Sequence, residues 1–508
     1  MADLPKKIVN FRFFPILFLC MIIGSLVASL TFFEPYFPYY VMGVGLILAL
    51  VLFVVKRRKA ILPIICILGL LCTYVLAFGQ IDEGIRAEDY FEAEIVEARV
   101  EYVEDSIVVV SIVDGVDGVD GLCEFDTNGV YDYPLNIGNV LTLGSVKIEK
   151  LSPLETDGVL NTYFFNSRTR YTMTAVELIS FDEGGANIVE AIRNGLMNAT
   201  KNLPDDVRGV TIALLTGDKY ALNDEIYDNY KVSGTAHVLA VSGMHVGFLV
   251  LFLEFILKRL RLKRIYRIVV LVPILFFLCA LCDFTPSVVR SAIMVSVHLL
   301  IPVLTKRKYD TLSSMSLAGV VILIANPMSV YNYGFLLSYS SVLGITLFGR
   351  TFDRWFKFLP KTIGSIVSVS MAATVGVLPL NIYLFGEFSL LSILTNVLVL
   401  PVLIFGYGVL VLFAFISVVF PPFAFLMEGA SWLTYYMNFV TGVIASVDFM
   451  SVNMKAPLWF CLAYYLFVVV LSDFINLKRE TKRIILIAFI ILLCAYFCFF
   501  CNFSPKIN

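Results

Sequence analysis

The stretch that decides the fold reads Lys231-Val-Ser-Gly-Thr-Ala-His-Val-Leu-Ala-Val-Ser-Gly-Met-His-Val-Gly247 and leads directly into an apolar run. It holds two of the three histidines of the chain. Ionisable groups are costly to place in hydrocarbon, so they usually mark a site or a pathway. On one continuous helix, His237, Val241 and His245 share a stripe, and Ser242 lies one turn below His245. The stretch therefore predicts a polar seam at the mouth of a membrane helix, where glycines let another helix or a ligand approach closely.

The amino-acid composition indicates a membrane protein. Of its 508 residues, 59% are hydrophobic and 15% are charged, whereas soluble domains carry about 25% charged residues. Apolar runs of about 20 residues, the length that crosses a bilayer as a helix, recur along most of the chain. We therefore expect a polytopic α-helical membrane protein with about eleven spans.

The expected spans form an early group of three and a later group after a strand-rich insertion. Residues 390–444 are ambiguous, because Pro401, Gly406 and Gly408 interrupt the apolar run and a proline pair at 421–422 breaks it again. They make either two crossings or a broken, re-entrant pair. The other expected spans are 13–33, 39–55, 61–78, 237–257, 268–282, 287–304, 312–325, 334–348, 363–384, 458–474 and 483–500.

Basic residues gather in short loops between the apolar runs, at 56–59, 258–267, 306–308 and 478–483. An excess of Lys and Arg in short loops marks the cytoplasmic side of a membrane. With the amino terminus in the cytoplasm, the 56–59 cluster falls inside and the segment after Phe78 falls outside. We expect the first span to be an uncleaved anchor, since its apolar run is too long for a signal peptide.

The insertion between residues 82 and 183 has a different periodicity. Residues 91–100, 107–113, 139–150 and 171–178 are strand candidates, and a Gly- and Asp-rich turn region lies at 114–121. Short strands at this density predict a small closed barrel or a sandwich. Residues 82–160 include 19 acidic and 4 basic residues, a net charge of −15. Cys123 is the single cysteine of the insertion, so no disulfide forms within it.

These patterns divide the chain into four parts. Residues 1–80 are an amino-terminal three-span segment, and residues 81–185 are an extracytoplasmic β domain. Residues 186–235 are amphipathic helices that carry too many charges to span, so we expect them at the outer interface. Residues 236–505 are a helical membrane domain.

Further polar residues lie in or beside the later spans. Arg290 falls about one turn inside the span that begins at Ser287, and Ser338 and Asn396 lie in apolar runs. Each has a plain structural interpretation. An arginine near the interface reaches the headgroups, Ser and Asn link helices by hydrogen bonds, and His237 is an ordinary interfacial residue. The alternative is that together they mark a pathway through the membrane.

The order of these residues resembles a known family. The run from Gly217-Asp218 through Tyr230 to Gly247 is similar to the signature of the ComEC-type competence family, DNA-internalisation channels of the bacterial plasma membrane. The likeness covers about residues 205–405, and its motif positions include Gly217, Asp218, Gly234, Gly243, Gly247, Pro327 and Gly334. Supporting matches, in family order, are Ser287 to Arg290, Arg307, Asp310, Asn326, Gly334 to Tyr339, Asn396 and Pro401.

The resemblance implies an OB-like barrel on the outer face and a helical core that passes single-stranded DNA inward. OB folds bind single strands through aromatic stacking and a basic groove. A pore for a polyanion needs donors and positive charge where water is scarce. The channel candidates are His237, Ser242, His245, Arg290, Ser338 and Asn396, and the DNA-contact candidates in the OB-like domain are Tyr163, Phe164, Arg168 and Arg170.

The sequence also departs from the family pattern. The acidic insertion repels phosphate, and Leu336 stands where the family often has glutamine. Many members carry a metallo-β-lactamase-like nuclease domain with a His-x-His-x-Asp-His cluster, and none of the three histidines here is so spaced. We therefore expect no metal, no cofactor and no enzymatic activity, and a separate nuclease if one strand is degraded.

The expected partners are single-stranded DNA, the lipid bilayer, a DNA receptor and cytoplasmic translocase proteins. Pulling on the DNA is assigned to the translocase proteins, since the chain lacks a Gly-x-x-x-x-Gly-Lys-Ser/Thr phosphate-binding loop. Two other functions stay open. One is a transporter or export channel for another substrate on the same helical core. The other is an intramembrane hydrolase that uses Ser242 with His245 or His237.

Overall fold

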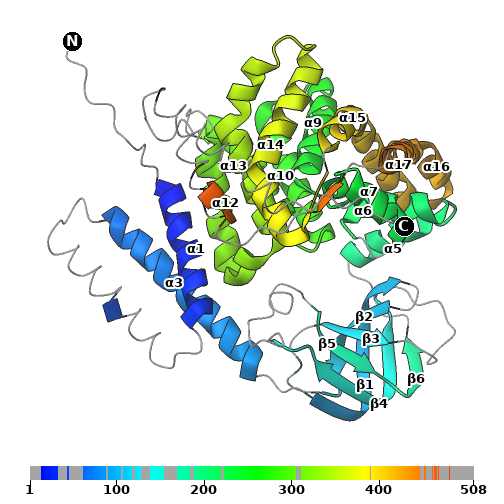
Figure 1. Ribbon diagram of the computed structural model, residues 1–508. Helices are drawn as coiled ribbons and strands as arrows, with labels where there is room; N and C mark the ends of the chain where they lie inside the picture. The colour runs from blue at the N-terminus through cyan, green and yellow to red at the C-terminus, as the bar shows by residue number, and fades with distance from the viewer. Residues whose placement is uncertain are drawn as a thin grey trace.

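The apolar runs form a helical body, and the alternating insertion forms a barrel beneath it (Figure 1). In this computed structural model, the amino-terminal helices α1 (Phe13–Thr31) and α3 (Ile61–Arg86) pack together beside α12 (Thr311–Ala325). The structure describes residues 13–31, 43–44, 61–86, 90–104, 107–116, 119, 122–126, 138–153, 169–182, 188–218, 222–304, 310–389, 391–446, 451–453, 460–461, 463–465, 467 and 480. The expected spans at 39–55, 458–474 and 483–500 lie largely outside these residues.

The insertion folds into a closed five-stranded barrel. Strand β1 pairs with both β2 and β4, and β3 runs parallel to β5, so the hydrogen bonds return to β1 in the order β1-β2-β3-β5-β4. Alternate residues point inward, as Val96, Ala98 and Val100 do in β1. The strands are β1 (Tyr90–Glu104), β2 (Ile107–Asp114), β3 (Leu122–Asp126), β4 (Val140–Lys150), β5 (Thr169–Thr174) and β6 (Glu177–Asp182), the last paired with β4.

Cys123 lies in the barrel interior and is fully buried. Burial raises the pKa of its thiol to about 12, because the charged thiolate loses its hydration there. The side chain therefore stays protonated and packs as a small apolar residue.

Two details of the barrel differ from expectation. Strand β3 is additional to the expected strands, and the strand expected at 171–178 is in fact two strands. Strand β5 pairs with the carboxyl end of β4 and β6 pairs with its amino end, so the chain bends between them at Ala175 and Val176.

Helices α5, α6 and α7 connect the barrel to the membrane domain. They span Ile188–Ala199, Asp205–Thr216 and Asp224–Val232. Helix α5 contacts the barrel through an ion pair between Glu190 and Arg99 of β1, with 2.8 Å between the charged atoms. Helix α6 is buried along most of its length, so it belongs to the interior of the helical body and lacks the interfacial character expected for 186–235.

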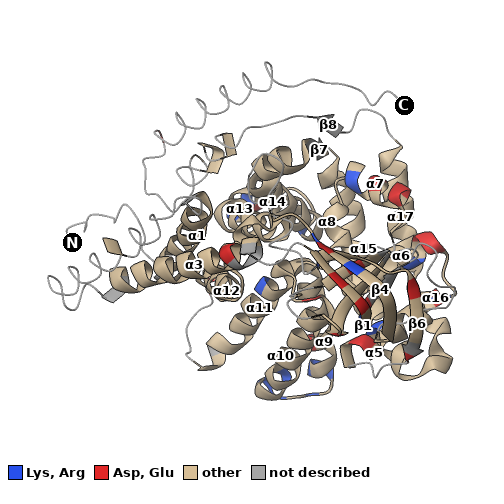
Figure 2. Cartoon of the chain, turned by 90° about the horizontal axis from the view of Figure 1, so that it is seen from below, with Lys and Arg blue, Asp and Glu red and all other residues tan. Residues whose placement is uncertain are grey.

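Five described helices are long and apolar enough to cross a membrane. Shorter apolar helices lie at Phe14–Leu30, Pro286–Ile301 and Thr311–Ala325. The principal helices of this domain are α9 (Gly243–Arg259), α10 (Arg264–Leu281), α11 (Pro286–Leu304), α13 (Tyr333–Trp355), α14 (Lys361–Phe385), α15 (Ser392–Val419), α16 (Phe425–Ala430) and α17 (Trp432–Ala445). In Figure 2 these helices are mostly tan, the colour of uncharged residues, and positions coloured red for Asp and Glu are prominent on the barrel strands.

The ambiguous region 390–444 contains one unbroken long helix. Helix α15 runs through Pro401 and both glycines and ends before Pro421, where η2 (Pro421–Phe423) begins. Gly408 serves packing here, since a Cβ at this position would lie 2.4 Å from the ring of Phe252 in α9. The glycine lets the two helices approach closely.

The polar seam is not one helix, so the expected single stripe of His237, Val241 and His245 is wrong. Helix α8 (Ala236–Leu239) ends before Ala240, which is extended, and α9 begins only at Gly243. Ser242 is extended, with φ −129° and ψ 178°, as an N-cap residue requires. The break follows from the Ser-Gly pair, which favours the start of a new helix over the continuation of the old one.

Candidate functional site

Ser242 and His245 form the amino-terminal cap of α9. The backbone N–H of Ser242 donates to Nδ1 of His245 at 3.2 Å. In a capping box, the side chain of the third helical residue reaches back in this way to the N–H of the N-cap residue. The bond occupies the lone pair of Nδ1, so the neutral ring carries its hydrogen on Nε2. His245 thereby holds the start of α9 in place.

The same geometry bears on Ser242 as a nucleophile. Its Oγ lies 3.4 Å from Nδ1 of His245, the nitrogen that already accepts from the backbone. A serine and its general base normally lie within about 2.6–3.2 Å of each other. The arrangement therefore favours helix capping over an activated serine.

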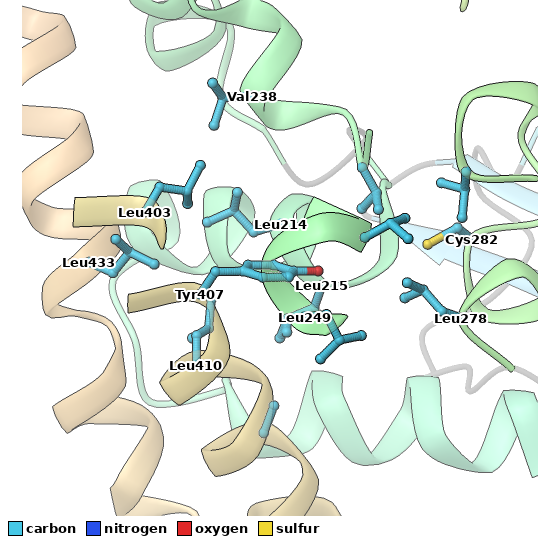
Figure 3. Close-up of a cluster of buried hydrophobic side chains, with 14 of the residues drawn as sticks. Leu214, Leu215, Val238, Leu249, Leu278, Cys282, Leu403, Tyr407, Leu410 and Leu433 are labelled. Atoms are coloured by element: carbon cyan, nitrogen blue, oxygen red, sulfur yellow. The ribbon is translucent and has the colours of Figure 1, made fainter. Parts of the chain in front are cut away.

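His245 is completely buried against Tyr407 of α15. The two ring centroids are 4.9 Å apart in an edge-to-face arrangement. Tyr407 projects into a cluster of buried side chains that includes Leu214, Leu249 and Cys282 (Figure 3). Within the described part of the chain, His245 Nε2 and Tyr407 Oη have no hydrogen-bond partner. His245 thus lies in the core of the helical body rather than in an open passage.

His237 has a different environment. Its side chain is exposed and lies beside the backbone of Gly234, whereas Val238 and Leu239 next to it are fully buried. The two histidines of the seam therefore differ in environment: His237 is exposed, and His245 is buried.

Arg290 joins two helices of the membrane domain. Its side chain is buried one turn inside α11, and its Nε donates to Ser338 Oγ of α13 at 2.8 Å. Its Nη2 donates to Ser291 Oγ at 3.1 Å, and its Nη1 lies 3.3 Å from the sulfur of Met294. The ring of Tyr339 is 5.9 Å from the guanidinium carbon. The guanidinium turns into the protein, so it does not reach for the headgroups.

Gly243 brings the start of α9 onto this Arg290 cluster. A Cβ at Gly243 would lie 2.6 Å from Ser291 Oγ and 2.9 Å from Arg290 Nη2. A larger residue at this position would therefore displace the ends of these two side chains. The cap at Ser242 and the guanidinium on α11 are therefore direct neighbours, and α9, α11 and α13 meet at one point.

Among the described helices, α9, α11, α13, α14 and α15 pack in a closed circuit, because each contacts the next and α15 returns to α9. Figure 2 views these helices from the barrel side. One face of α9, formed by Gly247, Leu251 and Phe255, lies between the faces that meet α11 and α15. A Cβ at Gly247 has no atom within 4 Å, and Leu251 and Phe255 are 65% and 70% exposed. We call this the open face of α9.

Asn396 lies apart from the Arg290 cluster. It is buried in α15, about 16 Å along the helix from Tyr407. Its Oδ1 has no hydrogen-bond partner among the described residues. The preceding Thr395 donates to the carbonyl of Ser233 at 3.0 Å, which links α15 to the end of α7.

Several motif positions shape the backbone. Gly217 and Gly234 have positive φ angles of 85° and 76°, at the ends of α6 and α7. Pro327 begins the short helix η1 (Pro327–Tyr331), and the carbonyl of Gly334 accepts from Ser287 Oγ at 3.1 Å. The last of these contacts ties the start of α13 to the start of α11.

Of the four DNA-contact candidates in the barrel, the structure describes Arg170. Tyr163, Phe164 and Arg168 lie outside the described residues. Arg170 lies in β5 and lines a cavity of about 1290 Å³ between the barrel and helices α10, α11 and α12. This cavity borders a different face of α11 from the one that carries Arg290.

Two residues of the site, Ser291 and Tyr407, are additional to the candidates from the sequence. Ser291 follows Ser287 by one helical turn, so the sequence spacing already places both on one face of α11. Tyr407 stands between two glycines in α15, and its contact with His245 depends on a tertiary approach that no local pattern reveals.

Comparison with known proteins identifies the family. Residues 214–479, more than half of the chain, match the family described as competence protein. The chain belongs to the competence protein family. The resemblance in the sequence is thereby confirmed, and this competence family member is a membrane protein. The match begins after the barrel, so the barrel is assigned from its strand order alone.

Three relatives illustrate the likeness of this competence family member. ComE operon protein 3 of Bacillus subtilis is 31% identical over 232 residues, which are 46% of this chain and 29% of that protein. An uncharacterised protein of Aquifex aeolicus is 35% identical over 251 residues, 48% of this chain and 57% of that protein. Recombination protein 2 of Haemophilus influenzae is 26% identical over 224 residues, 41% of this chain and 28% of that protein. The matched regions therefore span less than two thirds of each relative, and no solved structure matches the chain.

Proposed function

We propose that this protein is a channel that passes single-stranded DNA across the bacterial plasma membrane during natural transformation. Membership of the competence protein family and the likeness to ComE operon protein 3 support a role in DNA uptake. The observation that carries the proposal is the buried Arg290 cluster, which gathers a guanidinium, two hydroxyls and the start of α9 at one point of the helical circuit.

The chemistry of this cluster suits a passing phosphate. A guanidinium offers a planar set of donors that matches phosphate geometry. Held in a low-dielectric setting, such a charge attracts an anion more strongly than it does in bulk water. The circuit of helices supplies the surrounding walls, and the open face of α9 provides accessible space next to the cluster. The strand then passes the Arg290 cluster as it moves along the open face of α9.

The barrel supports the same proposal from outside the membrane. The strand order β1-β2-β3-β5-β4 with β3 parallel to β5 agrees with the expected OB-like domain, and OB folds bind single strands. We place it on the outer face and the amino terminus in the cytoplasm, because basic residues lie in the α9–α10 and α13–α14 connections. A DNA receptor would deliver the strand, a cytoplasmic translocase would pull it, and a separate nuclease would act if one strand is degraded.

One observation favours a second candidate, a transporter or export channel for another substrate. The net charge of −15 over residues 82–160 disfavours tight binding of a polyanion to the barrel. A strain that lacks this protein yet takes up DNA normally would support the second candidate and contradict the first.

The test replaces Arg290 with alanine. We expect transformation frequency to fall about 100-fold, because loss of ~3 kcal/mol of charge-assisted phosphate contacts corresponds to that factor. Arg267→Ala is the matched control, since Arg267 pairs with Glu254 at 3.3 Å and lies outside the Arg290 cluster. Immunoblots of membrane fractions establish equal amounts of each variant. Normal transformation by the Arg290→Ala protein would contradict the proposed role of Arg290.

A further inference from the structure

The cavity between the barrel and the membrane domain has the shape of a groove along α11. Its floor follows α11 from Pro286 to Leu300, a distance of about 21 Å. Helices α10 and α12 form its two sides, and β1, β3 and β5 lie at one end. One leaflet of a bilayer has a hydrocarbon depth of about 15 Å, half of ~30 Å. The groove is thus long enough to accommodate one acyl chain.

The deep part of the groove is apolar. Below the first turn of α11, the described lining residues from α10, α11 and α12 carry hydrocarbon side chains, apart from Cys279 and Ser296. Phe276 and Val321 on the two sides are 68% and 44% exposed. A nucleic acid in this part would lose the hydration of its phosphates without cationic partners. A hydrocarbon chain has no such hydration to lose. The apolar walls therefore suit an acyl chain better than DNA.

The end of the groove at the barrel is polar and carries charges of both signs. Arg170 of β5, Glu101 of β1 and Asp283 after α10 line this mouth. Asn326 and Asn332 also line it. Their side-chain oxygens accept from backbone N–H groups at 2.9 and 3.1 Å, which leaves their amide nitrogens as donors.

We propose that this groove binds a zwitterionic phospholipid such as phosphatidylethanolamine. Its phosphate lies at Arg170 and the asparagine amides, its ammonium at the carboxylate of Glu101, and one acyl chain along α11. Asp283 is already paired with Arg193 at 2.7 Å, so the guanidinium of Arg170 and the carboxylate of Glu101 are the groups that complement a headgroup with one charge of each sign. An anionic headgroup without an ammonium offers no cation to Glu101. The lipid would then fill the junction between the barrel and the helical body.

The experiment measures lipid retained by the full-length protein. The protein is reconstituted in nanodiscs with equal parts of phosphatidylethanolamine and phosphatidylglycerol and analysed by native mass spectrometry after release. We expect one phosphatidylethanolamine to remain bound in preference to phosphatidylglycerol. Val321→Trp fills the groove and should lose this lipid. Val269→Trp is the matched control, because Val269 is a 62% exposed residue of α10 outside the groove, and it should keep the lipid.

Two further variants separate the parts of the headgroup. Arg170→Gln should lower total lipid retention by about tenfold, as expected for the loss of one charge-assisted contact. Glu101→Gln should remove the preference for phosphatidylethanolamine over phosphatidylglycerol. Equal retention of both lipids by the wild-type protein, or equal retention by the Val321→Trp and Val269→Trp proteins, would overturn the proposal. So would photo-crosslinking from position 321 to a single-stranded oligonucleotide in place of lipid.

Discussion

At Ser242 and His245 the chain turns from the short helix α8 into α9, and the reciprocal hydrogen bonds of a capping box stabilise that turn. His245 takes the position that Glu or Gln usually holds in a capping box. Its complete burial against Tyr407 explains why an aromatic ring suits this position. His245, one of the channel candidates from the sequence, therefore caps α9, and Arg290 is the charged residue where α9, α11 and α13 meet.

This assignment predicts different outcomes for two substitutions of His245. His245→Gln keeps an acceptor for the Ser242 N–H, so we expect nearly wild-type thermal stability in detergent and nearly normal transformation. His245→Leu removes the acceptor and should lower the free energy of unfolding by about 1 kcal/mol, the usual cost of a lost cap. Loss of transformation by a stable His245→Gln protein would instead indicate a direct functional role for the imidazole.

The helices themselves were largely predictable, because length and hydropathy are local properties of the sequence. The runs at 268–282, 287–304 and 312–325 correspond closely to α10, α11 and α12. The break at Ser242 and the continuity of α15 through Pro401 were not predicted. Both depend on packing, since neighbouring helices decide whether a Ser-Gly pair or a proline interrupts a helix.

Helices α13 and α14 approach each other through glycine. A Cβ at Gly376 would lie 2.2 Å from the carbonyl oxygen of Ser340. Helix α14 is further supported beside Pro379, where Tyr464 donates to the carbonyl of Val375 at 2.7 Å. That carbonyl loses its helical donor because proline has no N–H.

We therefore expect Gly376→Ala to lower the thermal unfolding temperature in detergent, because the methyl group forces the two helices apart. Gly442→Ala is the matched control, since a Cβ at Gly442 in α17 meets nothing within 4 Å. That variant should be neutral or more stable by up to about 1 kcal/mol, the helix-propensity difference between the two residues. Equal effects of the two substitutions would show that the close contact at Gly376 does not stabilise the pair.

On the scale of the whole molecule, the barrel, the helical circuit and the lipid groove are arranged around α11. One face of α11 carries Arg290 and Ser291, and another faces the cavity that reaches Arg170 in the barrel. Sequence patterns predicted the barrel and the membrane domain as separate parts. They did not predict this arrangement, because the contacts join residues more than 100 positions apart. Tyr163, Phe164 and Arg168 stay sequence predictions.

The orientation of the molecule can be tested with single cysteines in a cysteine-free background. We expect Glu177→Cys, on an exposed barrel strand, to react with a membrane-impermeant maleimide in intact cells. Lys357→Cys, in the exposed α13–α14 connection, should react only after the membrane is permeabilised. The expectation follows from the basic residues around position 357. The reverse labelling pattern would place the barrel in the cytoplasm and rule out the proposed direction of uptake.

The most direct test of the channel is photo-crosslinking to DNA in transit. A benzophenone amino acid is placed at Leu251, on the open face of α9, and at Val269, on an exposed part of α10 outside the circuit. Cells receive labelled DNA whose inward movement is arrested by a bulky end group. We predict that the strand crosslinks from position 251 and not from position 269. Absence of a crosslink at 251, or equal crosslinking at both positions, would contradict passage of DNA through the circuit of helices.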